Sequence, residues 1–461
     1  MKIPRILLAA GASGSGKTLI TCGMLKALVD RGLKTASFKC GPDYIDPMFH
    51  SRVIGTRARN LDTFFTSEKI TRAIFQKNAQ GFDISVMEGV MGFYDGVGGT
   101  TTKASAYDLA SVTDTPVILI VNSKGMSVSL AAYIKGFLEY RKDSRIKGVI
   151  FNQMSAMLYP RMKELVEKEL GISVFGYVPT VEDCVIESRH LGLVLPDEIP
   201  ELQKKLQKLS GILEETLDMD GILALADSAP DMEEASYEIS YKTQELVRIG
   251  VACDEAFCFF YEDNFRILKE MGAELIYFSP VHDSCLPKDL DGLLLYGGYP
   301  ELNGKALEEN ESMRNEIREK LEGSLPCMAE CGGFMYLHEE MEDIEGNIRK
   351  MAGVIKNRVF RTPRLSRFGY VTLSQKKSVF GQEDLGKIPA HEFHYFDSEN
   401  CGEDFYAIKP QSKRGWDCIH GTDNLLAGFP HLYYFGNPKI PEAFLKKCLE
   451  YKKIKTRRKI G

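Results

Sequence analysis

The chain has 461 residues, of which 44% are hydrophobic, and its formal net charge is −6. A chain of this length is too long for one hydrophobic core and fits two or three domains. It has no apolar run of the ~20 residues that span a bilayer, and its acidic balance argues against general nucleic-acid binding. The apolar stretch near the start is too short for a signal-peptide core, so we expect a cytoplasmic protein without a membrane partner.

The eleven cysteines also bear on the class of protein. Their number is odd, their spacing is irregular, and no C-x-x-C pair occurs. These features argue against a disulfide framework or a zinc ribbon. We expect most of the cysteines to be buried, small apolar residues.

Strand-like and helix-like segments alternate through the first half of the chain. Short apolar or β-branched runs predict strands at residues 5–10, 35–40, 83–87, 115–121 and 147–152. Helical spacing predicts helices at 17–30 and 128–140. This alternation is typical of a doubly wound parallel sheet in an α/β fold.

The pattern changes between residues 196 and 245, where polar and charged residues predict a helix pair and an acidic linker. A second alternation then predicts strands at 247–252, 274–278, 292–296 and 325–329, with a helix at 261–271. We therefore divide the chain into an α/β domain at 1–195, a helical segment and linker at 196–245, a second α/β domain at 246–440 and a basic, solvated tail at 441–461.

A glycine-rich loop, GASGSGKT, follows the first predicted strand and opens the first predicted helix. It matches the pattern G-x-x-x-x-G-K-[ST] at every required position. Gly11, Gly14 and Gly16 let backbone N–H groups converge on phosphate oxygens, aided by the partial positive charge of the helix N-terminus. We predict that Lys17 reaches the β- and γ-phosphates of ATP and that the Thr18 hydroxyl ligates Mg²⁺.

A magnesium site also needs carboxylates. Asp46 and Glu88 both follow predicted strands, so we expect them at the carboxyl edge of the sheet, where ligands bind in this architecture. Mg²⁺ prefers one or two carboxylates together with phosphate and water oxygens. We therefore assign Thr18, Asp46 and Glu88 to the metal and keep Asp43 as a weaker candidate. The alternative role for each acid is a turn cap or a surface position.

A cysteine in a second glycine-rich turn is the other reactive centre. Cys331 lies between a predicted strand and a predicted helix at 334–339, where a helix N-terminus favours the thiolate. The N–H of Gly332 supplies one half of an oxyanion hole, and Gly297 or Gly298 supplies the other. The alternative is a buried thiol in a structural turn.

A cysteine nucleophile also requires a base, and we assign His431, which gives a Cys–His pair. The competing histidines are His391 and His394, in a segment that resembles a metalloprotease motif only superficially. They are three residues apart on a predicted strand, so their side chains face opposite sides and are not expected to share a metal.

Together these motifs resemble the cobyrinate a,c-diamide synthase family of cobalamin biosynthesis. That family joins a dethiobiotin-synthetase-like ATP-binding domain to a class I glutamine amidotransferase domain. The resemblance covers nearly the whole chain and is carried by the order of the phosphate loop and the segments 39–47, 88–96, 257–264, 297–301, 330–337, 391–395 and the surroundings of His431.

The resemblance implies that Cys331 is the glutaminase nucleophile and that His431 activates it. The wider class places a glutamate two residues after the histidine, but Tyr433 stands there in this chain, and the family tends to lack that acid. The working hypothesis is a Cys–His dyad oriented by a backbone carbonyl, with its third member left open. The residues expected near the reacting carboxylate of the substrate are Asp43, Tyr44, Asp46 and Glu88.

The implied activity is ATP- and glutamine-dependent amidation of the a and c carboxylates of cobyrinate, through an acyl phosphate and free ammonia. The substrates are then cobyrinate, L-glutamine and ATP with Mg²⁺. Alternatives are the same chemistry on nickel-sirohydrochlorin or hydrogenobyrinate, another glutamine-dependent ligase, or an ATP-switched partitioning or binding protein with an inert second domain. A homodimer, the order of the amidations and the ammonia path are left open.

Overall fold

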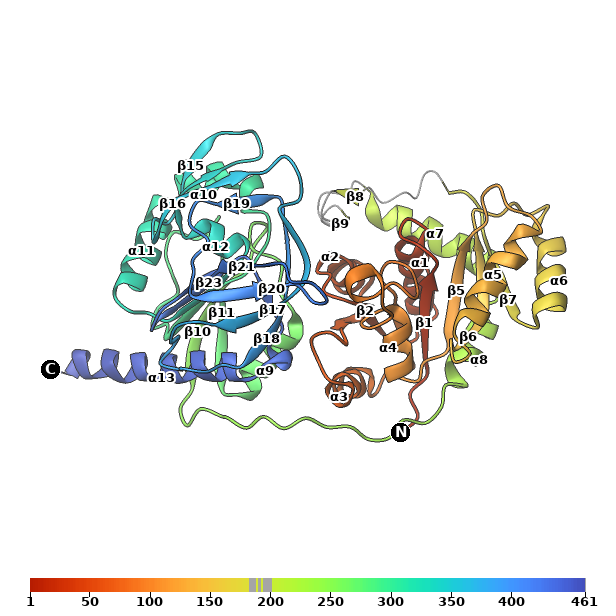
Figure 1. The fold of residues 1–461 in the computed structure, drawn as a ribbon, viewed down its shortest axis with the longest axis horizontal. Helices are drawn as coiled ribbons and strands as arrows, with labels where there is room; N and C mark the ends of the chain where they lie inside the picture. The colour runs from red at the N-terminus through yellow and green to blue at the C-terminus, as the bar shows by residue number, and fades with distance from the viewer. Residues whose placement is uncertain (182–187, 190–191, 194–200, 461) are drawn as a thin grey trace. The chain divides into compact units, whose positions relative to one another are not determined.

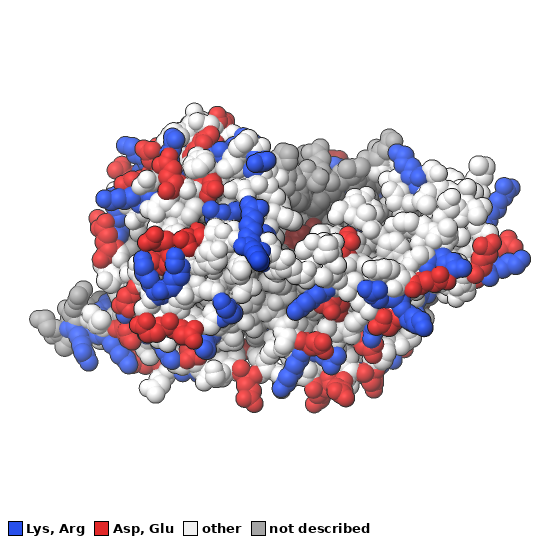
Figure 2. Space-filling model, in the orientation of Figure 1, with Lys and Arg blue, Asp and Glu red and all other residues white. Residues whose placement is uncertain are grey.

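The computed structural model describes residues 1–181, 188–189, 192–193 and 201–460. It divides into two compact units, Met1–Tyr237 and Glu238–Gly461 (Figure 1). In the described part of the chain the cysteines are free thiols, and no helix is both long and apolar enough to cross a membrane. Among the described residues on the face drawn in Figure 2, basic and acidic side chains are interspersed.

The first unit is built on one parallel sheet of seven strands. They are β1 (Arg5–Ala10), β2 (Thr35–Cys40), β3 (Arg57–Leu61), β4 (Ile84–Glu88), β5 (Val117–Asn122), β6 (Ile146–Asn152) and β7 (Ser173–Val178). The strand order is β3-β2-β4-β1-β5-β6-β7, so strands lie on both sides of β1, and β4 is inserted between β1 and β2. This confirms the predicted doubly wound α/β fold, and β1 and β2 are buried along their whole length as such strands should be.

Helices connect these strands. They are α1 (Lys17–Asp30), α2 (Ile45–Met48), the π-helix η1 (Phe49–Ile54), α3 (Glu68–Ala79), the 3₁₀ turn η2 (Val97–Gly99), α4 (Ala106–Val112), α5 (Ser129–Tyr140), α6 (Tyr159–Leu170), α7 (Leu202–Thr216) and α8 (Met219–Asp227), with a small hairpin of β8 (Ser188–Arg189) and β9 (Gly192–Leu193). α7 packs closely on α1, where a Cβ at Gly23 would lie 2.7 Å from Leu209. The two helices of the predicted 196–245 segment, α7 and α8, therefore belong to the first compact unit.

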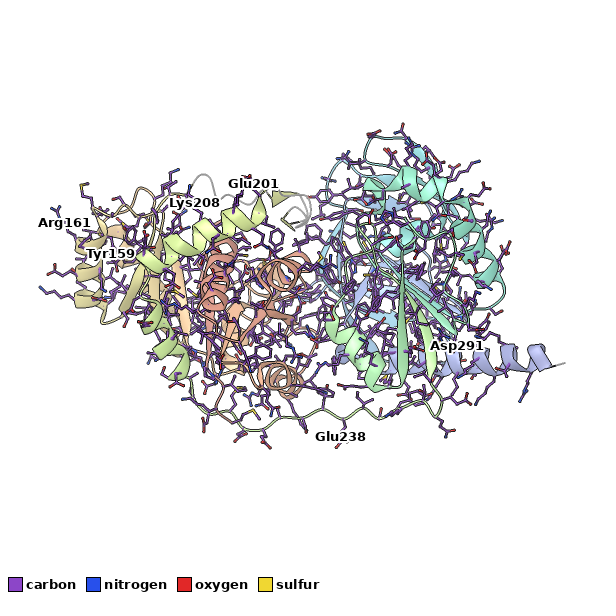
Figure 3. All side chains as sticks on the ribbon, turned by 180° about the vertical axis from the view of Figure 1, so that it is seen from behind. Tyr159, Arg161, Glu201, Lys208, Glu238 and Asp291 are labelled. Carbon is purple, nitrogen blue, oxygen red and sulfur yellow. The ribbon has the colours of Figure 1, made fainter. Side chains whose placement is uncertain are left out.

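An extended segment follows α8 and passes through Glu238, where the second unit begins (Figure 3). The start of this segment is tied to the first unit. The guanidinium of Arg5, which is fully buried, donates to the carbonyl oxygens of Thr113 and Pro230 at 3.0 and 2.8 Å. The N-terminal amine donates to the carbonyl of Met232 at 2.7 Å.

The second unit has a six-stranded sheet in the order β11-β10-β12-β13-β23-β22. Its strands are β10 (Val247–Ala252), β11 (Ala273–Phe278), β12 (Gly292–Leu295), β13 (Cys327–Glu330), β22 (His420–Gly421) and β23 (Leu425–Gly428). All neighbours are parallel except β22, which is antiparallel to β23. This second parallel sheet is the one that the alternation after residue 246 predicts.

Two further sheets, most of whose strands the sequence did not predict, are formed mainly by the chain between β13 and β23. Their strand pairs are antiparallel, except that β14 and β16 are parallel. The first has the order β15-β14-β16-β19, and the second has the order β21-β20-β17-β18-β24. Their bounds are β14 (His338–Glu342), β15 (Ile348–Lys350), β16 (Ile355–Arg361), β17 (Arg367–Gln375), β18 (Lys387–His394), β19 (Phe396–Ser398), β20 (Phe405–Ile408), β21 (Gly415–Cys418) and, after β23, β24 (His431–Leu432).

The remaining helices of this unit are α9 (Glu262–Glu270), η5 (Pro300–Leu302), α10 (Gly304–Glu309), α11 (Glu311–Glu322), α12 (Gly332–Tyr336), η6 (Tyr434–Gly436) and α13 (Lys439–Ile460). Residues 441–460 of the expected basic tail belong to helix α13. The reason is that Phe444, Leu445 and Cys448 form an apolar face that is fully buried.

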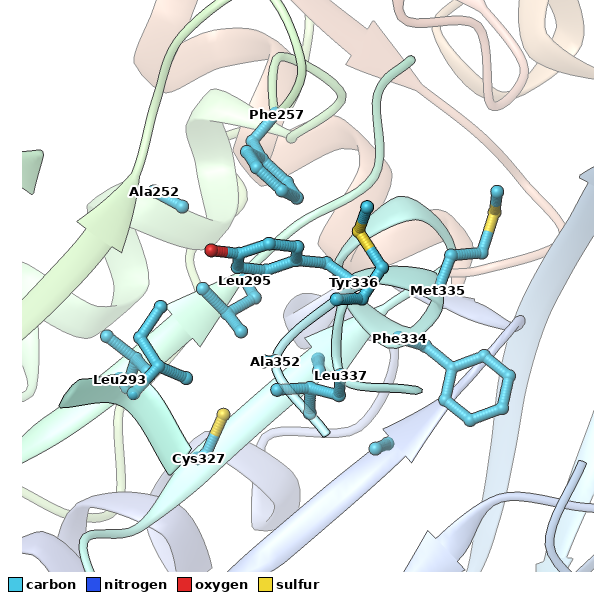
Figure 4. Close-up of a cluster of buried hydrophobic side chains, with 14 of the residues drawn as sticks. Ala252, Phe257, Leu293, Leu295, Cys327, Phe334, Met335, Tyr336, Leu337 and Ala352 are labelled. Atoms are coloured by element: carbon cyan, nitrogen blue, oxygen red, sulfur yellow. The ribbon is translucent and has the colours of Figure 1, made fainter. Parts of the chain in front are cut away.

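The core of the second unit gathers around α12. Leu293 and Leu295 of β12, Cys327 of β13 and Tyr336 of α12 belong to one cluster of buried side chains (Figure 4). Burial of each leucine side chain contributes about 1.5–3 kcal/mol. This packing fixes the turn between β13 and α12, which carries Cys331.

Candidate functional site

The phosphate loop occupies the turn from β1 into α1, as predicted. Gly16 has a φ of +89°, a backbone conformation that favours glycine. A Cβ at Gly16 would also lie only 2.2 Å from Nδ2 of Asn152, and that nitrogen donates to the carbonyl of Ser15 at 2.9 Å. The close approach of β6 therefore requires a glycine here and holds the loop in its curved form.

Lys17 lies across this loop. Its Nζ donates to the carbonyl oxygens of Ala12 at 3.2 Å and Met91 at 2.6 Å, and both acceptors are neutral. Burial, together with the nearby charge of Lys39, lowers the pKa of Lys17 to about 8, although Glu88 opposes the shift. A bound anion would restore the charge of Lys17 fully, which suits a phosphate ligand.

A buried polar cluster stands beside the loop at the carboxyl edge of the sheet. Glu88 Oε1 accepts hydrogen bonds from Thr18 Oγ1 at 2.6 Å and from Lys39 Nζ at 2.7 Å. Lys39 also forms an ion pair with Asp46, and Nε2 of His50 lies 3.4 Å from Glu88 Oε2. The structure thus brings together the three predicted metal residues, and it adds Lys39 and His50, which sequence reasoning missed.

The charges in this cluster are unequal. Burial raises the pKa of Glu88, but Lys39 and then His50 lower it by more than burial raises it. The net pKa of Glu88 therefore falls below the usual range. Burial lowers the pKa of Lys39, yet Asp46 and Glu88 raise it well above its ordinary value. Burial and the charge of Asp43 raise the pKa of Asp46. The shifts of Lys39 and Glu88 both favour their charged forms, whereas burial disfavours the charged form of Asp46 and Lys39 opposes that shift.

The two remaining predicted substrate residues, Asp43 and Tyr44, lie directly before α2. Oδ1 of Asp43 accepts from the N–H groups of Ile45 at 2.8 Å and Asp46 at 3.2 Å, so its side chain stabilises the first turn of α2. This is the turn-cap role that the sequence left as the alternative. Tyr44 precedes the same helix and is partly buried.

The donor set beside the loop fits a hydrated Mg²⁺. Thr18 and Glu88 offer hard oxygen atoms next to the phosphate loop, and the remaining ligands would come from phosphate and water. Among the residues that the structure describes, no group of three or more His, Cys, Asp and Glu side chains is arranged to hold a metal alone.

Cys331 stands at the turn between β13 and α12. Its φ of +47° and ψ of −105° are unusual for a residue with a side chain, and such strain is concentrated at functional sites. The N–H of Cys331 donates to the carbonyl of Gly428 at 2.8 Å. A Cβ at Gly333 would lie 2.0 Å from the carbonyl oxygen of Leu295, so the turn cannot be made without that glycine.

The two predicted oxyanion donors lie side by side. A Cβ at Gly332 would be 3.0 Å from the backbone nitrogen of Gly298. A Cβ at Gly297 would lie 3.4 Å from Cβ of Cys331 and 2.6 Å from Cε1 of His431. The loop after β12 therefore forms one wall of the cysteine site, with the N–H-bearing residue Gly298 beside Gly332.

His431 reaches the same place from β24. It is buried, and its Nδ1 lies 3.7 Å from Oε2 of Glu330, the residue before Cys331. Burial lowers the pKa of His431, but the charges of Cys331 and Glu330 raise it more, to about 9. The arrangement can hold a thiolate beside an imidazolium, which is the reactive form of a Cys–His pair.

The other two histidines of β18 have different surroundings. His391 is in register with His431 across the sheet, and burial together with the charge of His431 lowers its pKa to about 3. His394 stacks on Phe429 with ring centroids 3.9 Å apart and contacts Glu392 at 3.2 Å. Within the described residues, no group of three or more potential metal ligands includes them.

A nucleotide loop in one unit and a Cys–His pair in the other define a glutamine-hydrolysing ligase. Residues 6–193 match the CobQ/CobB/MinD/ParA nucleotide binding domain, and residues 248–439 match the CobB/CobQ-like glutamine amidotransferase domain. Cobyrinate a,c-diamide synthase of Caldanaerobacter subterraneus subsp. tengcongensis is 38% identical over 453 residues, which cover 97% of this chain and 99% of that protein. The enzyme of the same name from Clostridium acetobutylicum is 40% identical over 442 residues, which cover 94% of this chain and 97% of that protein. The chain belongs to the cobyrinate a,c-diamide synthase family.

Proposed function

We propose that this protein uses ATP and glutamine to convert the a and c carboxylates of cobyrinate to amides in cobalamin biosynthesis. Besides family membership, one observation carries the proposal: a single chain holds both Lys17 in a phosphate loop and Cys331 beside His431. A phosphate site can activate an acid, and a Cys–His site can free ammonia. Only the two together make an amide from glutamine.

The activation half belongs to the first unit. Lys17, Thr18 and the loop N–H groups bind the triphosphate of ATP. Mg²⁺, held by Thr18 and Glu88, would offset the negative charge of the phosphates. A carboxylate oxygen of the substrate attacks the γ-phosphorus and ADP leaves, so the acid becomes an acyl phosphate. Lys39, kept charged by Glu88 and Asp46, presents a cation beside the phosphate loop.

The ammonia-producing half belongs to the second unit. Sγ of Cys331 attacks the amide carbon of glutamine, and the N–H groups of Gly298 and Gly332 stabilise the oxyanion. His431 gives its proton to the leaving nitrogen, and ammonia departs. Water then attacks the thioester, which releases glutamate and restores the thiol. Ammonia attacks the acyl phosphate and displaces phosphate, leaving the amide.

Glutamine labelled at its amide nitrogen tests the proposal. With ATP and cobyrinate, we expect one label in each amide formed, as read by mass spectrometry of the product. Parallel reactions with hydrogenobyrinate and nickel-sirohydrochlorin identify the preferred macrocycle. If either of these two macrocycles is labelled faster than cobyrinate, that macrocycle is the preferred substrate. If none of the three acquires label, the proposed function is wrong.

The oxyanion hole gives a further prediction, for Gly332→Ala. The added Cβ would meet Cδ of Pro300 at 2.9 Å and the nitrogen of Gly298 at 3.0 Å, and so would push the two donors apart. Loss of one such donor lowers kcat by about 10²–10³-fold, so we expect a fall of this order in glutamine hydrolysis. The control is Gly211→Ala in α7, where a Cβ meets nothing within 4 Å. Steady-state glutamate release from both variants decides; equal rates would contradict the role of Gly332.

A further inference from the structure

The acid that usually orients the histidine in this class of glutaminase is absent from its usual position. Tyr433 stands two residues after His431, and its hydroxyl donates to Oδ2 of Asp263 at 3.0 Å. Asp263 is itself paired with Arg266 at 2.7 Å. The side chain at position 433 is therefore engaged in a structural network and supplies no carboxylate to His431.

Glu330 brings a carboxylate to His431 from the opposite direction in the chain. It is the last residue of β13, directly before the nucleophile, and only 5% exposed. Its Oε2 lies 3.7 Å from Nδ1 of His431 and accepts from the N–H of Leu432 at 3.4 Å. One carboxylate thus touches the strand β24 at two neighbouring residues, one of which is the base.

A carboxylate at this place is costly for the fold. Burial raises the pKa of Glu330, and only His431 and the N–H of Leu432 lower it. Its Oε1 has no hydrogen-bond partner in the described part of the chain. A buried charge without compensation strongly destabilises a protein, so packing alone would favour an apolar residue at the end of this strand. The compensation available is positive charge on His431.

We propose that Glu330 is the positioning residue for His431: its carboxylate holds the imidazole through Nδ1 and stabilises the imidazolium opposite Cys331. The inference rests on the proposed glutaminase role of that pair and deepens it. Nδ1–H of His431 donates toward Glu330, which leaves Nε2 to exchange a proton with the sulfur and the leaving nitrogen. Glu330 keeps its negative charge throughout, as the acid of a Cys–His–acid triad does.

Three titratable residues on different segments of the chain lie near His431. Glu330 lies on β13, Cys331 on the turn that follows, and His391 on the adjacent strand β18. His391 is neutral near pH 7 because its pKa is lowered to about 3, by burial and then by the charge of His431. Once Sγ of Cys331 has formed the thioester and lost its charge, Glu330 is the anion that remains beside the imidazolium.

Glu330→Gln tests the proposal, because it keeps the shape of the side chain and removes its charge. We expect kcat for glutamine hydrolysis to fall about 10²–10⁴-fold with little change in KM, since in this proposal Glu330 acts through His431 rather than on the substrate. His431 is protonated below its pKa of about 9. Loss of the neighbouring anion lowers that pKa, so the alkaline limb of the kcat profile should move down by about one pH unit or more.

Tyr433→Phe is the matched control, because it changes the position where the class carries its acid. It should keep the kcat and the alkaline limb of the parent protein. Glu330→Asp retains the charge with a shorter reach, so we expect partial recovery of kcat. If Glu330→Gln does not fold, Glu330→Asp decides: an alkaline limb below that of the parent supports the proposal, and an unchanged limb overturns it.

The outcomes separate this inference from the proposed function. If Glu330→Gln hydrolyses glutamine with the parent kcat and alkaline limb, while Cys331→Ala does not hydrolyse it, Glu330 has no positioning role and the proposed function stands. If Cys331→Ala still hydrolyses glutamine, the proposed function itself fails. Amidation supported by ammonium salts should be the same in Glu330→Gln as in the parent protein, which excludes general misfolding.

Discussion

Replacement of Cys331 by alanine abolishes amidation from glutamine and leaves amidation from ammonium salts intact; this is the expected result of the first experiment. In the proposed mechanism the thiol of Cys331 is the protein group that forms a covalent bond to glutamine. Its loss should therefore lower glutamine-dependent turnover by roughly 10³-fold or more. The ammonia route bypasses the thioester, and the activation chemistry of the first unit does not use Cys331.

The matched control for Cys331→Ala is Cys327→Ala, four residues earlier at the start of β13. Cys327 is fully buried, and burial alone raises the pKa of its thiol well above the ordinary value, so it is inert as a nucleophile. Amide formation with glutamine and with ammonium chloride, followed by chromatography of the macrocycle, measures both routes. Loss of the ammonia route in Cys331→Ala, with Cys327→Ala unaffected, would contradict the division of the chemistry between the two units.

The elements around the phosphate loop could be predicted because each is locally determined. β1, α1 and β2 have the predicted bounds, since continuous apolar runs separated by glycine turns are typical of buried parallel strands and their helices. β3 was missed because its sequence, RARNL, is half polar and lies at the edge of the sheet. Packing against β2 makes it a strand, and that information is not local.

Most strands of the two further sheets of the second unit were missed for a related reason. Only two residues of β16 and two of β17 are buried, and their sequences, IKNRVFR and RFGYVTLSQ, intersperse charged and polar residues with the apolar ones. Such strands are stabilised by pairing with partners distant in the chain rather than by their own pattern. Their importance to the site is nevertheless direct, because β18 of the same sheet pairs with β24, which carries His431.

The candidate site shows the same distinction between local and long-range information. Gly16, Lys17 and Cys331 could be identified because a motif specifies each within a few residues. Lys39 and Glu330 could not, because their roles depend on contacts with residues 49 and about 100 positions away. A signal did exist in both cases: a charged residue lies within or at the end of a strand that is otherwise expected to be buried, and such a residue needs a partner.

Replacement of Lys17 by methionine should remove both routes of amidation, because the activation of the carboxylate precedes capture of ammonia from either source. Methionine keeps much of the length of the side chain and removes the cation that would neutralise the β- and γ-phosphates. We expect turnover with glutamine and with ammonium salts to fall together by about 10²–10³-fold or more. Weaker ATP binding, measured by calorimetry, should accompany the loss.

Lys26→Met is the control for Lys17→Met, since Lys26 lies on the same helix, α1, and its ion pair with Asp30 is partly exposed. Such pairs contribute about 0–1 kcal/mol, so this variant should bind ATP and turn over normally. The pH dependence adds an independent check on Lys17. Its pKa is lowered to about 8 by burial and by Lys39, so it loses its charge as the pH rises through that value. ATP affinity of the parent protein should therefore decline above about pH 8, and Lys17→Met should lack this decline. An ammonia route that survives in Lys17→Met would show that the phosphate loop does not activate the acid.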